Sequence, residues 1–195
     1  MMVPAHTLSG LICLHLGQIL VSRTDGTARW SKTPRWAWLA LGLGLAFLSH
    51  ALIDTLAIFT YHDSSPSGSI FSRLVFWSWI LSGAGTITWA VWTDVRYSYG
   101  ILVALSYDIW DHYILRCVDG VLDGFPEGFM VRYTRRFEVL QLHQLEWLLL
   151  DNLLVGIERH YGDPRFLIVE IIFVLILITS LIYLRFSRPL DSKYV

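Results

Sequence analysis

Residues 36–60, WAWLALGLGLAFLSHALIDTLAIFT, decide the fold class, because this long apolar run has only one histidine and one aspartate as ionisable side chains. An α-helix rises about 1.5 Å per residue, so about 20 mainly apolar residues cross the hydrocarbon core of a bilayer. Trp36 and Trp38 stand at its start, as expected at a membrane interface. Gly42 and Gly44 would let another helix approach closely. The run predicts a transmembrane helix.

Five further stretches have a similar apolar character, and we expect each to form a membrane helix. The first is interrupted by polar residues, whereas the last is apolar almost throughout. A β-barrel would need segments of about ten alternating residues, and the sequence has none. We therefore predict an all-α, polytopic transmembrane bundle of about 5–6 helices in one domain, residues 1–195. The expected spans are 5–21, 36–60, 74–92, 99–118, 139–156 and 166–184.

The overall composition agrees with a membrane protein. Hydrophobic residues make up 54% of the chain, charged residues only 16%, and the mean hydropathy is +0.51. Such an apolar excess indicates the lipid bilayer as the environment of the chain. The formal net charge of -1 provides no basic field, so nucleic acid is not an expected partner.

Ionisable side chains gather near the ends of the predicted spans, where they are functional candidates because they are costly to bury in lipid. His50 and Asp54 are four residues apart, which places both on one helix face. Near the end of span 99–118, Asp108, Asp111 and His112 are spaced i, i+3 and i+4, which also places them on one helix face. Together the candidate metal ligands are His6, His50, Asp54, Asp108, Asp111, His112 and His143, with Glu146 beside the last.

If the spans alternate in direction, these groups lie at the same membrane face. Imidazole and carboxylate ligands suit divalent zinc, manganese or iron. A metal would lower the pKa of a bound water, and Asp54 or Glu146 could accept its proton as a catalytic base. The pattern thus favours a metal site in an interfacial layer.

Simpler interpretations remain open for each residue taken alone. His6 or His143 could be an interfacial or capping histidine, and the group at 108–112 would be merely solvated if its helix stops at the interface. His15 is expected to hydrogen-bond a neighbouring helix. The chain has no HExxH motif or cysteine quartet, so its spacing alone does not define a known metal site.

The string FLSHALID, residues 47–54, resembles the Ser-His-x-x-x-Asp motif of small bacterial membrane-bound metal-dependent hydrolase-like proteins, a group that includes LexA-binding inner-membrane proteins. The opening Pro4-Ala5-His6, the segment DIWDH at 108–112 and LHQLE at 142–146 are also similar to family segments. The chain departs from the family where Ile58 replaces a second histidine and Tyr107 a proline. The resemblance implies a metal site and a bacterial inner (cytoplasmic) membrane.

These observations lead to two functional hypotheses. In the first, the protein is a metal-dependent hydrolase that acts on a phosphoester or acyl bond of a lipid at the membrane face. In the second, it is a non-catalytic accessory subunit of a larger membrane protein complex, and its abundant aromatic and glycine residues contact protein partners. Metal content separates the first hypothesis from the second.

Overall fold

The computed structural model describes residues 3–25, 36–56, 69–115, 117–118, 142 and 163–187. Every regular element within these ranges is helical, as the sequence predicts. Within the described residues, four helices are long and apolar enough to cross a membrane, which confirms the all-α transmembrane bundle. They are α1 (Val3–Asp25), α2 (Ala37–Leu56), α3 (Ile70–Thr93) and α8 (Leu167–Ser187), the last extended at its start by the 3-10 turn Pro164–Phe166.

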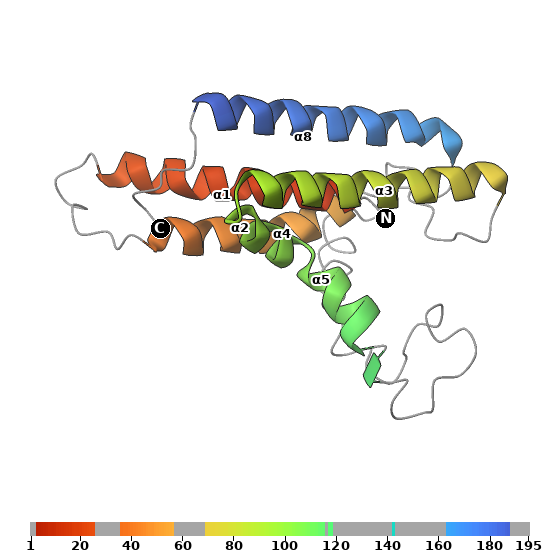
Figure 1. Cartoon of the computed structure of the whole chain (residues 1–195), viewed down its shortest axis with the longest axis horizontal. Helices are drawn as coiled ribbons and strands as arrows, with labels where there is room; N and C mark the ends of the chain where they lie inside the picture. The colour runs from red at the N-terminus through yellow and green to blue at the C-terminus, as the bar shows by residue number, and fades with distance from the viewer. Residues whose placement is uncertain are drawn as a thin grey trace.

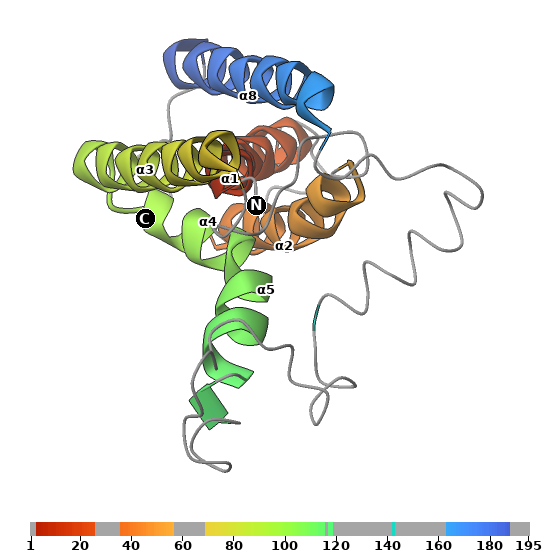
Figure 2. The same cartoon turned by 90° about the vertical axis from the view of Figure 1, so that its right-hand side faces the viewer.

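The stretch expected as a span at 99–118 is not one continuous α-helix. It consists of α4 (Tyr97–Ala104), the short α5 (Ser106–Asp108) and a π-helix, η2 (Ile109–Ile114). The break lies at Leu105, whose φ of -95° and ψ of 4° leave the helical region. Beyond it, the chain turns away from the bundle, as Figures 1 and 2 show. The expected span 139–156 lies outside the described residues, except for Leu142.

Helix α1 is the centre of the bundle. It packs against α2, α3, α4 and α8, and these neighbours surround it in Figures 1 and 2. Accordingly, 67% of the most apolar stretch of α1 is buried, compared with 28% of that of α2, 17% of that of α8 and 11% of that of α3. The outer helices therefore leave most of their apolar surface uncovered by the described part of the chain, while the inner helix is largely enclosed by it.

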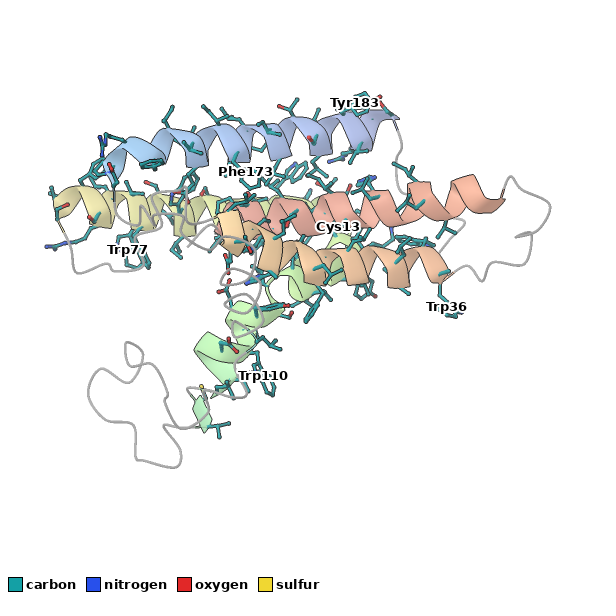
Figure 3. All side chains as sticks on the ribbon, turned by 180° about the vertical axis from the view of Figure 1, so that it is seen from behind. Cys13, Trp36, Trp77, Trp110, Phe173 and Tyr183 are labelled. Atoms are coloured by element: carbon teal, nitrogen blue, oxygen red, sulfur yellow. The ribbon has the colours of Figure 1, made fainter. Side chains whose placement is uncertain are left out.

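The core lies along α1. The leucines of α1 that form it pack against residues of several neighbouring helices. Leu8, Leu11 and Leu14 are buried and pack with Ile101 of α4 and Val174 of α8. On α8, Phe173 points toward this core and Tyr183 points away from it (Figure 3). The side chain of Tyr183 is 67% exposed, which fits an aromatic ring at a membrane interface.

Glycines set the closest helix contacts. A Cβ on Gly10 of α1 would lie 2.5 Å from the carbonyl oxygen of Gly100 in α4, and Gly17 of α1 is equally crowded by the backbone of α2 at Gly42. Gly44, which the sequence paired with Gly42, meets nothing within 4 Å. Only Gly42 therefore makes the close contact that was expected of both.

Side-chain hydrogen bonds lie at both ends of α3, but only the one at its start caps the helix. The hydroxyl of Ser69 accepts a hydrogen bond from the backbone N–H of Ser72 and caps the start of the helix. After the end of α3, Arg96 donates from its backbone N–H and from Nε to Oδ1 of Asp94, at 2.9 and 2.8 Å. This Asp94–Arg96 pair closes the turn into α4.

Candidate metal centre

The start of α1 and the end of α2 lie side by side and bring together three side chains: His6, His50 and Asp54. Nε2 of His6 is 3.0 Å from Oδ1 of Asp54, and Nε2 of His50 is 3.2 Å from Oδ2 of the same carboxylate. His6 and His50 are buried, and the Asp54 side chain is 14% exposed. One ligand atom from each residue lies within 4.8 Å of the others, so the group could hold a metal ion.

His50 is oriented by a backbone carbonyl. Its Nδ1 lies 2.5 Å from the carbonyl oxygen of Ala104. A carbonyl oxygen only accepts hydrogen bonds, so Nδ1 carries the hydrogen and donates it. Nε2 of a neutral His50 then directs a lone pair at the Asp54 carboxylate. Two electron-rich atoms at this distance require a cation between them or a shared proton, carried by His50 or by the Asp54 carboxyl.

The break in the helix makes that carbonyl available. Ala104 is the last residue of α4, and carbonyls in the last turn of a helix lack intrahelical partners. The next residues add a further contact, because the ring of Tyr107 stacks on His50 with centroids 4.5 Å apart. On its other side His50 stacks on His6 at 4.0 Å. The imidazole of His50 is therefore fixed between two rings and one hydrogen bond.

The charge balance of the group favours a bound cation. The stacked rings of His6 and His50 disfavour a positive charge on both, because like charges this close repel strongly in a buried site. Two carboxylates face them: Asp54, and Asp108, which is buried and close enough to His6 to act on it electrostatically. A metal-ligating imidazole is neutral, so a bound divalent ion would take the place of an imidazolium in balancing the Asp54 carboxylate that both rings face.

The interatomic distances also suit a metal. Zinc–nitrogen and zinc–oxygen bonds of about 2.0–2.2 Å in a tetrahedral site place neighbouring ligand atoms about 3.3 Å apart. The two imidazole–carboxylate distances, 3.0 and 3.2 Å, are already in that range. Bringing the whole group around an ion requires side-chain shifts on the order of 1 Å. The carbonyl on Nδ1 of His50 supplies the outer hydrogen bond typical of metal-binding histidines.

Among the remaining candidates from the sequence, the structure describes the side chain of Asp111 but not those of three others. Asp111 is buried in η2, outside the three-residue group, and its Oδ1 accepts the backbone N–H of Leu142 at 2.9 Å. The side chain of His112 lies outside the described part of the chain, as do His143 and Glu146, so their proposed roles stay predictions.

The sequence does not predict a role in the site for the Ala104 carbonyl or for the ring of Tyr107. A backbone carbonyl has no sequence signal, but an aromatic residue directly before Asp108 could have been included with that segment. The expectation for His15 is confirmed, because its Nε2 lies 2.8 Å from the hydroxyl of Tyr97 on α4.

Comparisons of the chain with protein-family models, curated proteins and solved structures find no match. The interpretation of the metal group therefore depends on its own geometry.

Proposed function

We propose that the protein is an integral membrane metalloprotein that holds a divalent zinc, manganese or iron ion with His6, His50 and Asp54. The observation that carries this proposal is the orientation of His50. Its Nδ1–H is engaged by the Ala104 carbonyl, and Nε2 points at Asp54 Oδ2 from 3.2 Å. A cation between these atoms turns an unfavourable contact into two ligand bonds.

The chemistry that we propose is hydrolysis of a phosphoester or acyl bond in a lipid. A bound divalent ion acts as a Lewis acid and lowers the pKa of a coordinated water toward about 7. Each Asp54 oxygen faces a histidine, which suits a ligand better than a base. Asp108 is the described carboxylate best placed to take a proton, because it is buried and interacts electrostatically with His6. Glu146 remains the alternative base from the sequence.

The position of the group supports a lipid substrate. It lies where α1 begins and α2 ends, near one end of the helices that could cross a membrane. A lipid could place its polar head there while its tails stay between the helices and the bilayer. The residues of the group also carry the resemblance to membrane-bound metal-dependent hydrolase-like proteins, and with it the proposal of a bacterial inner membrane.

Metal analysis of the detergent-purified protein, dialysed against a weak chelator, tests the site. We expect one zinc, manganese or iron ion per chain, lost in His50→Ala and in Asp54→Asn. The matched control is His15→Ala, which removes another buried histidine of α1 whose partner is Tyr97. Asp111→Asn should also keep the metal, since its amide oxygen can still accept the Leu142 N–H.

Two outcomes would overturn the metal site: a parent protein without metal, or equal metal loss in the His15 and His50 variants. If metal is bound, vesicles containing phosphoester and acyl lipids serve as substrates for the parent and for Asp108→Asn. A metal-loaded parent that cleaves none of them would remove the hydrolase proposal and leave the metalloprotein proposal standing.

A second candidate, the accessory subunit of a membrane complex, is favoured by the exposure of α3. Only 11% of the most apolar stretch of α3 is buried, and the side chains of Trp77 and Trp92 are 55% and 91% exposed. Aromatic residues are common in protein interfaces as well as in membrane interfaces. Stable co-purification of other membrane subunits with a metal-free chain would support this candidate over the first.

A further inference from the structure

A carboxylic acid lies in the most apolar helix of the bundle. Helix α8 contains Glu170, and the side chain is only 1% exposed, although the helix around it faces outward. Ile168, Val169, Ile171 and Ile172 are 57%, 41%, 38% and 50% exposed. Val174 and Leu181, which follow at i+4 and i+11, belong to the buried core. Glu170 therefore lies on the stripe of α8 that packs against α1.

Neither oxygen of Glu170 has a hydrogen-bond partner within the part of the chain that the structure describes. Trp79 packs against the same core, and its indole N–H likewise has no acceptor among the described residues. The described titratable or charged side chains of α1 and α8 are placed elsewhere. His6 pairs with Asp54, His15 contacts Tyr97, and Cys13 packs with Ala46 and Ala104. On α8, Arg185 lies over the ring of Trp89 and Tyr183 is 67% exposed.

The N-terminal amino group acts on Glu170 electrostatically, but the carboxyl is shielded from water, and none of the described side chains forms an ion pair with it. An ionised carboxylate in this position is therefore unfavourable in an apolar interior. Binding a proton removes the charge. We infer that Glu170 is an intramembrane proton-binding site, separate from the metal group, where a neutral carboxylic acid is held between α8 and α1. Such a group releases its proton only when water or a base reaches it, so its protonation is coupled to opening of the α1–α8 contact.

A hydrophobic carbodiimide tests this state, because dicyclohexylcarbodiimide modifies protonated carboxyl groups in apolar surroundings. The acid proton moves to a carbodiimide nitrogen, the carboxyl oxygen bonds to the central carbon, and the acyl group then shifts to nitrogen as a stable adduct. With the full-length protein in phospholipid vesicles at neutral pH, peptide mass spectrometry should find one adduct on Glu170. Asp94 and Asp163, which are paired with Arg96 and Arg165, should stay unmodified.

Glu170→Gln gives the matched control, because it keeps the shape of a neutral carboxylic acid but cannot form the adduct. We expect its Tm to equal that of the parent, whereas loss of an ionised, stabilising carboxylate would lower the Tm. The inference is overturned if Glu170 is not modified, if a water-soluble carbodiimide modifies it equally well, or if Glu170→Gln is clearly less stable. None of these outcomes depends on whether the protein binds a metal.

Discussion

The contact between Gly10 of α1 and Gly100 of α4 should control the metal group from a distance, and Gly10→Ala is the substitution that tests this. The new methyl group would lie 2.5 Å from the Gly100 oxygen and 2.8 Å from Cβ of Ala104. Atoms in van der Waals contact are about 3.5–4.0 Å apart, so α4 must move away from α1 by on the order of 1 Å. Ala104, whose carbonyl orients His50, moves with it.

The energetic cost follows from two opposing effects. Overpacking a tight contact costs about 1–3 kcal/mol, whereas replacing glycine by alanine within a helix gains up to about 1 kcal/mol from propensity. Gly44→Ala isolates the second effect, because a Cβ there meets nothing within 4 Å. The difference between the two variants is then the steric cost alone. For a chain of this size it corresponds to a Tm about 2–12 °C lower in Gly10→Ala than in Gly44→Ala.

Thermal unfolding in detergent and metal titration give the two measurements. Losing an outer-shell hydrogen bond typically weakens metal binding about 10–100-fold. We therefore expect weaker metal binding in Gly10→Ala and parental binding in Gly44→Ala. Equal Tm and equal metal affinity in both variants would refute the argument that the Gly10–Gly100 contact sets the position of the Ala104 carbonyl.

Two further predictions concern residues outside the metal group. His15→Phe should destabilise the protein by about 1–3 kcal/mol, because the buried Tyr97 hydroxyl loses its partner; adding Tyr97→Phe should recover part of this loss in thermal unfolding. Partial burial raises the pKa of Asp94, but its bonds from Arg96 outweigh this effect and hold the pKa below its ordinary value. The parent protein should thus have a higher Tm than Asp94→Ala above about pH 4, and this difference should disappear in stronger acid.

The membrane helices could be predicted from the sequence because hydrophobicity is a local property of each run. The pairing of His6 with the His50–Asp54 group also followed from the sequence, since alternating spans place the start of one helix beside the end of the next. The helical spacing of His50 and Asp54 predicts a shared face, and both side chains indeed reach His6 or each other in the structure.

The break at Leu105 could not be predicted in the same way. No proline or glycine marks it, and the carbonyl that it frees is used by His50, which is 54 residues away in the sequence. This contact is tertiary and has no local pattern. By contrast, the sequence could have predicted that only one of Gly42 and Gly44 contacts a neighbouring helix. Residues two apart on a helix point about 200° away from each other, so one partner helix cannot contact both.

The enclosed position of α1 has a consequence for how the protein is made. This helix is the least apolar of the four that could cross the membrane, and it precedes all of its neighbours in the chain. While the ribosome still holds the later segments, the buried His6, Ser9 and His15 have none of the packing that later covers them. Among the described helices, α1 is thus made before the helices that cover it, and it depends on the later α8 for part of its packing.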